Sequence, residues 1–226
     1  MADEKEDLYK PKEKEKLLSP DGNIIYFLTK VGQIVILNIV WFVSCLPVVT
    51  IGAATTSLYY AMMKNIRRNR SYPLTEYRAS FKRTLGKGSI VTLGCGLWLL
   101  LLWYFRSTTL SASGGAENFA SCLYLVLMIV TAAVLVYLFP VMSRFSLGMV
   151  SLIKLAFVMS VRYIGYTIVI LLGTMLLNWI WFYFLPLPTI FIWPGIWCYI
   201  CTFMIEKALR KYMPAPSEGE DAWYYE

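Results

Sequence analysis

The stretch VGQIVILNIVWFVSCLPVVTIGAATTSLYYAMM, from Val31 to Met63, contains 33 residues and no charged side chain. A single helix of that length would be about 50 Å long, whereas the hydrocarbon core of a bilayer is about 30 Å thick. Pro47 lies near the middle of the stretch and lacks the N–H group that a continuous helix requires. The stretch therefore predicts a hairpin of two membrane spans, Ile24 to Leu46 and Val49 to Met63.

Charge is equally scarce further along the chain. Of the 226 residues, 58% are hydrophobic and only 15% are charged, against about 25% charged in soluble domains. Three more runs carry no charge: Gly88 to Phe105, Asn118 to Ser143 and Tyr163 to Ile205. The last run is interrupted by prolines and is expected to form two spans, Ile164 to Leu185 and Thr189 to Ile205. The sequence thus predicts an all-α polytopic membrane bundle of six transmembrane helices.

The basic residues indicate how this bundle is oriented. With the N-terminus in the cytoplasm, 20 of the 21 lysines and arginines fall on the cytoplasmic side, and Arg106 is the exception. This asymmetry predicts a multi-pass protein of the bacterial plasma membrane with both termini in the cytoplasm. The expected organisation is a charged tail over residues 1–23, a membrane domain over 24–209 and a second tail over 210–226. The basic residues that give the chain its formal charge of +7 would then face anionic lipid headgroups. No nucleic-acid partner is therefore expected.

Two short amphipathic cytoplasmic helices are predicted between spans, at Pro73 to Gly86 and at Ser146 to Val161. In the first, apolar side chains recur every four residues beside cations: Tyr77, Phe81 and Leu85, with Arg78, Lys82 and Arg83. One interpretation is a docking helix for a soluble partner. The other, which the sequence favours, is an interfacial helix that lies on anionic lipid.

Small and hydroxyl-bearing residues follow the proline of the first hairpin: Pro47, Thr50, Gly52, Thr55 and Thr56. A broken helix here would aim free backbone N–H groups at a polar solute. The alternative, which this composition favours, is close helix packing. Asn38 and Asn178, the strongly polar side chains of the bilayer core, are likewise expected to form interhelical hydrogen bonds and not ligand contacts.

Several chemistries lack the residues they need. The chain has no histidine, and its spans hold no acidic residue except Glu206 at the inner edge of the sixth span. The five cysteines form an odd set in apolar surroundings, and Cys198 with Cys201 are too few for a structural zinc site. We therefore expect a protein that is not an enzyme and has no catalytic residue, cofactor or metal site. A pairing of Cys45 with Cys122, both near outer span ends, stays open.

The run Leu-Pro-Val-Val-Thr-Ile-Gly-Ala-Ala-Thr-Thr-Ser-Leu-Tyr-Tyr, residues 46–60, resembles the signature of the YesL-like bacterial membrane proteins. The resemblance extends to about Leu209 and includes Tyr77 to Lys82 and Phe139 to Arg144. That family is a domain of unknown function, typical of Gram-positive bacteria and tending to be encoded beside carbohydrate ABC importers and polysaccharide-degrading enzymes. The resemblance implies a role around glycan uptake and carries over no catalytic residue.

Two functional hypotheses follow. The first is a non-enzymatic accessory protein that associates with the permease or ATPase subunits of a carbohydrate ABC importer. The second is an autonomous small-solute carrier whose site lies at the helix break from Thr50 to Thr56. The sequence leaves the sugar, the partner subunit and homo-oligomer formation open.

Overall fold

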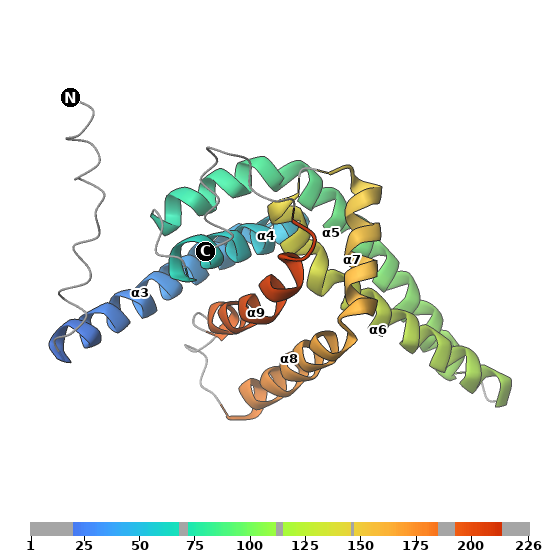
Figure 1. Ribbon diagram of the computed structural model, residues 1–226. Coiled ribbons are helices and arrows are strands. Elements are labelled where there is room, and N and C mark those ends of the chain that lie inside the picture. Colours follow the sequence, from blue (N-terminus) through green and yellow to red (C-terminus); the bar gives the residue numbers. More distant parts are fainter. Residues whose placement is uncertain (1–19, 68–71, 112–114, 146, 185–192, 214–226) are drawn as a thin grey trace.

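The computed structural model describes residues 20–67, 72–111, 115–145, 147–184 and 193–213, and helices dominate all five ranges. Within these ranges there is no β-strand, so the all-α prediction is confirmed. The elements in chain order are α3 (Pro20–Ser44), η2 (Val48–Thr50), α4 (Ile51–Ala61), η3 (Met62–Arg67), α5 (Pro73–Ser111), α6 (Gly115–Arg144), α7 (Met149–Arg162), α8 (Ile164–Phe184) and α9 (Trp193–Leu209), as Figure 1 shows.

The predicted turn at Pro47 is confirmed. Helix α3 ends at Ser44, and the single-turn helix η2 leads into α4. The Thr50 hydroxyl lies 2.6 Å from the carbonyl oxygen of Ser44 and 2.7 Å from that of Pro47. These contacts fix the turn locally, because the Ser44 carbonyl is one that the end of α3 leaves without a helical partner and the Pro47 carbonyl also accepts the Thr50 backbone N–H at 2.9 Å.

Hydrogen bonds between neighbouring helices show that α3 and α4 are antiparallel. Near the turn, Trp41 Nε1 donates to Thr55 Oγ1 at 3.4 Å, and at the far end Lys30 Nζ donates to the Asn65 carbonyl at 3.1 Å. Helices α4 and α5 are antiparallel for the same reason, since Gly52 faces Gly88 while Lys64 pairs with Glu76. Figure 1 shows α5 and α6 side by side, with their connected ends projecting beyond the other helices.

The predicted boundary between an amphipathic helix and a third span is wrong. Residues 73–111 form one continuous helix of 39 residues, and both Gly86 and Gly88 are helical. A Cβ atom on Gly88 would lie 2.6 Å from the backbone nitrogen of Ala53, so this glycine permits close approach of α4. Gly88 therefore serves a contact between two helices, whereas Gly86 is a helical residue with open space around it.

The second amphipathic element forms a separate helix, as predicted. It runs from Met149 to Arg162, with Gly148 at its N-cap, and α8 follows at an angle of 92°. Ser146, the first residue of the predicted element, lies outside the described residues. Residues 1–19 and 214–226, which make up most of the predicted tails (1–23 and 210–226), and residues 185–192 between the last two spans also lie outside them. The last four residues of the predicted N-terminal tail belong to α3.

Three described helices are long and apolar enough to cross a membrane, over Phe27–Ser44, Pro73–Leu110 and Phe119–Arg144. A fourth span is present if α7 and the described part of α8 are counted together as one bent span. These helices support an integral membrane protein, but the predicted count of six is not confirmed. Helix α4 has 11 residues and α9 has 17, so both are shorter than the roughly 20 residues of an ordinary span.

Helix α4 lies at the centre of the molecule. Eight of its eleven residues are buried, and neighbours from α3, α5, α6 and α9 surround it. In contrast, large apolar side chains on α5, α6 and α8 face outward, and Leu97, Leu172 and Met175 are each more than 60% exposed. Apolar exposure along whole helices is what lipid contact requires.

Candidate functional site

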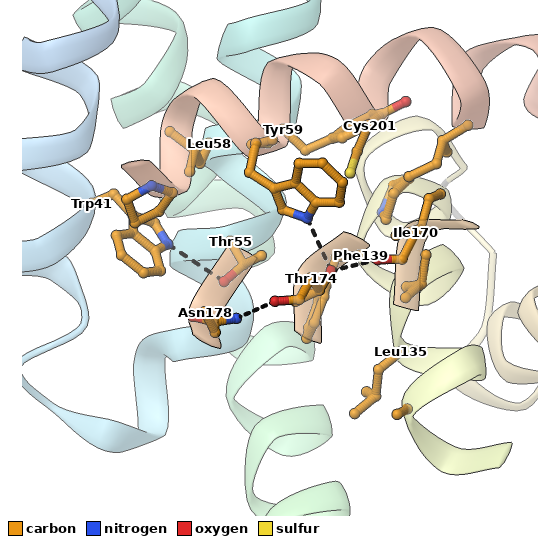
Figure 2. Close-up of a pocket in the computed structure, with 17 residues that line it drawn as sticks. Trp41, Thr55, Leu58, Tyr59, Leu135, Phe139, Ile170, Thr174, Asn178 and Cys201 are labelled. Carbon is orange, nitrogen blue, oxygen red and sulfur yellow. Dashed lines mark hydrogen bonds between the residues drawn. The ribbon is translucent and has the colours of Figure 1, made fainter. Parts of the chain in front are cut away.

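A cavity of about 510 Å³ lies among α3, α4, α6, α8 and α9 (Figure 2). Its wall is mainly apolar and aromatic, and includes Leu58, Leu135, Phe139, Ile170 and Trp197. Pro140 also lines it, at a point where α6 lacks one backbone donor. Its size is typical of a small-molecule pocket, so the few polar groups in the wall decide what it can bind.

The polar groups of the wall bond mainly to the protein itself. On one side Thr55 Oγ1 donates to the Ile51 carbonyl at 2.8 Å and accepts the Trp41 indole N–H. On the other side Thr174 Oγ1 donates to the Ile170 carbonyl at 2.6 Å. Few hydroxyl donors are therefore left for a ligand.

The α8 side of the cavity follows the same pattern (Figure 2). Trp197 Nε1 donates to Thr174 Oγ1 at 2.9 Å, and Asn178 Nδ2 donates to the Thr174 carbonyl at 2.7 Å. The first bond orients the indole of α9 against α8, and the second lies within α8. A ligand in this cavity would meet aromatic and aliphatic surface with only a few hydrogen-bonding atoms.

Next to the cavity, a buried ion pair joins α6 to α9. Arg144 Nη2 lies 3.2 and 3.3 Å from the two carboxylate oxygens of Glu206, and the two side chains are 5% and 0% exposed. Tyr59, which lines the cavity, donates its hydroxyl to Glu206 at 3.2 Å. The carboxylate thus links α4, α6 and α9, and loss of either charge would leave the other buried and uncompensated.

Sequence reasoning noted Glu206 but gave it no role. A lone carboxylate in an apolar helix needs a cation, and Arg144 ends a neighbouring span on the same predicted side of the membrane. That rule would have suggested the pair. The packing of Tyr59 against both could not have been inferred, since 147 residues separate it from Glu206.

Of the residues in the predicted polar segment, Thr55 is the one that lines the cavity. Pro47 and Thr50 form the turn, and Thr56 is fully buried and donates to the Gly52 carbonyl. Gly52 faces α5, and its backbone N–H donates to Thr92 Oγ1 at 2.8 Å. The Thr92 hydroxyl of α5 thus accepts the Gly52 N–H, which is one of the backbone donors that the broken-helix hypothesis assigned to a solute.

The two predicted asparagines have different surroundings. Asn38 is buried, and a side chain on Gly195 would clash with it, so Asn38 packs tightly against the start of α9. Asn178 lines the cavity and is exposed there. The structure therefore brings Thr55 and Asn178 to one cavity and places Asn38 in a helix contact.

The predicted docking residues divide into two groups. Tyr77 is 1% exposed and stacks on the partly buried Phe81, with ring centroids 6.1 Å apart. Arg78, Lys82 and Leu85 are exposed. The surface that this half of α5 offers to a partner is consequently more basic and less aromatic than its sequence pattern suggested.

The cysteines do not form a disulfide. All five are free thiols, including Cys45 and Cys122, so the pairing left open above is not formed. Cys198 and Cys201 line the cavity. Over the described ranges, no three residues of the His, Cys, Asp and Glu types group as a metal site would require.

Residues 34–105 match the family model described as "Protein of unknown function, DUF624". This region includes the C-terminal part of α3, all of α4 and most of α5, and so contains the Pro47 turn and the close contact between Gly52 and Gly88. No curated protein matches the chain, and no solved structure does. The description of this family names no activity.

Proposed function

We propose that this protein is a YesL-like plasma-membrane protein of a Gram-positive bacterium, and that it acts as a non-enzymatic accessory component of a carbohydrate ABC importer. The resemblance of residues 46–60 and the match over 34–105 support the family. In this proposal α4 and α9 are short spans, which gives six spans and two cytoplasmic termini. The partner is a permease or ATPase subunit of the importer.

The observation that carries the partner role is the exposed basic surface of α5. Arg78 and Lys82 lie one turn apart, both exposed, and Leu85 adds an apolar contact on the same half of the helix. No carboxylate within the described ranges pairs with either cation. An acidic surface on a cytoplasmic or interfacial part of a transporter subunit would complement this surface.

The cavity supports an accessory role over a sugar-carrying one. A sugar presents many hydroxyl groups, and each needs a partner when it leaves water. Here the Thr55 and Thr174 hydroxyls already donate to helix carbonyls, and both tryptophan N–H groups have acceptors. The sugar would then pass through the importer and not through this chain.

Affinity purification from the native host tests the accessory role. The tagged protein should recover permease or ATPase subunits, and Arg78→Gln with Lys82→Gln should reduce their yield at least about tenfold, since rim charges contribute to association. Arg83→Gln with Lys87→Gln removes the same charge from the same helix and is the matched control. Recovery of no importer subunit by the unmodified protein would contradict the proposal.

The orientation has its own test. In a cysteine-free background, a cysteine at position 78 should react with an impermeant maleimide only after the cells are opened. Labelling of this position from outside intact cells would refute the assignment of α5's basic half to the cytoplasm, and with it the proposed contact.

A second function, autonomous solute transport, is favoured by one observation: Thr55 and Asn178 line the same cavity. The purified protein in liposomes would then take up a labelled solute without any other subunit. Thr55→Val with Asn178→Leu should abolish that uptake, while Thr56→Val, which alters a buried neighbour outside the cavity, should not. Absence of uptake for all solutes tried would leave the accessory role as the better account.

A further inference from the structure

A small pocket of about 120 Å³ lies where the middle of α5 meets the C-terminal end of α6. Three cationic side chains line it: Arg83, Lys87 and Arg144. The hydroxyl-bearing residues Thr84 and Ser143 complete its polar wall. The pocket is separate from the large cavity and shares no lining residue with it.

The charges of this pocket are only partly balanced. Arg144 pairs with Glu206, but Arg83 donates to the Ser143 carbonyl at 3.4 Å and Lys87 to the Leu147 carbonyl at 2.9 Å. Within the described ranges neither Arg83 nor Lys87 meets a carboxylate. Ser143 lies in the last turn of α6, where the helix carbonyls carry only about half a negative charge in total, and the Leu147 carbonyl carries no formal charge, so the pocket retains a positive field.

Broad apolar surface begins beside the pocket. Within two turns beyond Lys87 on α5, Ile90 is 64% exposed and Leu93 is 57% exposed. On α7, which starts two residues after Leu147, Val150 is 67% exposed and Ile153 is 46% exposed. A compact cationic pocket at the edge of two exposed apolar helix surfaces matches an anionic group joined to hydrocarbon chains.

We propose that this pocket binds the phosphate group of an anionic phospholipid of the cytoplasmic leaflet. Arg83 and Lys87 contact the phosphate oxygens, and the acyl chains lie along Ile90, Leu93 and Val150. Both cations sit on exposed, solvent-accessible positions of α5, so they reach the phosphate without breaking the buried pair of Arg144 and Glu206. The bound lipid would hold α5 against the junction of α6 and α7.

Native mass spectrometry of the full-length protein in detergent tests this site. Phosphatidylglycerol and phosphatidylcholine are titrated separately, and the dissociation constant of the first bound lipid is measured. Each cation beside an anionic lipid contributes about fivefold in affinity, so we expect a preference of about 25-fold for phosphatidylglycerol. Equal affinity for the two lipids would overturn the proposal.

Two double variants decide where the preference arises. Arg83→Gln with Lys87→Gln should remove it, whereas Arg78→Gln with Lys82→Gln should retain it, because these two positions lie roughly 140° around the helix from the pocket. If the control pair loses the preference equally, the attraction is general and the pocket assignment is refuted. Lys87→Gln alone should reduce the preference for phosphatidylglycerol about fivefold, and this single variant tests the site if the double variant fails to fold.

A competition experiment separates the lipid from free phosphate. Inorganic phosphate at millimolar concentration should leave the bound phosphatidylglycerol in place, because it lacks the apolar contacts of the acyl chains. Displacement of the lipid by inorganic phosphate at equal concentration would refute the lipid as the ligand.

Discussion

The contact between Gly52 and Gly88 makes a sharp prediction, because the space that a methyl group would need is known. A Cβ atom on Gly88 would lie 2.6 Å from Ala53 N, 2.7 Å from its Cα and 2.9 Å from its Cβ. Ordinary carbon contacts are about 3.5–4.0 Å, so α4 and α5 would have to separate by roughly 1 Å. Two of the three atoms belong to the backbone, so a change of side-chain rotamer cannot relieve the clash.

The expected size of the effect follows from two opposing contributions. Forcing an extra methyl group into a packed interface costs about 1–3 kcal/mol. Replacing glycine by alanine inside a helix stabilises it by about 1 kcal/mol. Gly88→Ala should therefore be neutral to about 2 kcal/mol destabilising, with the larger value expected because backbone atoms are involved.

Gly86→Ala is the matched control. Gly86 lies on the same helix, two residues away, and no atom lies within 4 Å of a Cβ built there. This variant gains the helix contribution without the clash, so the two variants should differ by about 1–3 kcal/mol. For a protein of this size that corresponds to about 2–12 °C in thermal midpoint.

The measurement is thermal unfolding in detergent, followed by circular dichroism, with both variants in the same background. The order expected is Gly86→Ala highest and Gly88→Ala lowest. A Gly88→Ala protein as stable as Gly86→Ala would show that α4 and α5 do not approach as closely as described, and the packing explanation for the segment from Pro47 to Thr56 would fail with it.

Two further predictions concern the ion pairs. Glu206→Gln should destabilise the protein by about 3–5 kcal/mol, because it leaves the Arg144 charge buried without a carboxylate. Lys207→Gln, on the exposed side of the same helix, is the control and should change the unfolding midpoint little. Equal effects of the two variants would refute the buried pair. Burial alone lowers the pKa of Lys64, but the hydrogen bond and charge of Glu76, together with the neighbouring Tyr60, more than offset it, so the pKa is raised above its ordinary value. A raised folded-state pKa contributes stability that is fully present below the unfolded pKa of about 10.4 and is lost as the pH rises through the higher folded value. The small loss from Glu76→Gln, under about 1 kcal/mol, should therefore be constant between about pH 6 and pH 9, and a loss that disappears within that range would contradict the assignment.

The sequence was sufficient for features that depend on local chemistry. A proline inside a charge-free run predicted the turn at Pro47, because the missing N–H affects the adjacent turn of helix directly. The charge-free run from Asn118 to Ser143 predicted the apolar part of α6 closely, because the charged residue Arg144 follows it directly and ends the helix. Amphipathic spacing likewise predicted that α7 is a separate helix, and the structure places it at 92° to α8.

Local pattern failed where a residue serves a distant neighbour. Gly86 and Gly88 suggested a helix boundary, yet both are helical. The missing side chain of Gly88 allows close contact with Ala53, 35 positions earlier. The same limit applies to Tyr77, whose spacing with Phe81 and Leu85 predicted an apolar stripe that faces either lipid or a docking partner. An apolar stripe shows that a helix face is covered, but the sequence does not say whether protein or a partner covers it.

The polar segment after Pro47 shows why packing and binding are difficult to separate from composition. Both require small residues, and both require that the first N–H groups of α4 find acceptors. In the structure Thr92 Oγ1 accepts the Gly52 N–H at 2.8 Å while it donates to the Gly88 carbonyl at 2.9 Å. One hydroxyl on α5 thus caps the start of α4 at the point where the two glycines meet. Because that donor is already bound, a solute at the helix break would have to displace Thr92, and the wall around Thr55 and Asn178 is the more accessible place for any ligand.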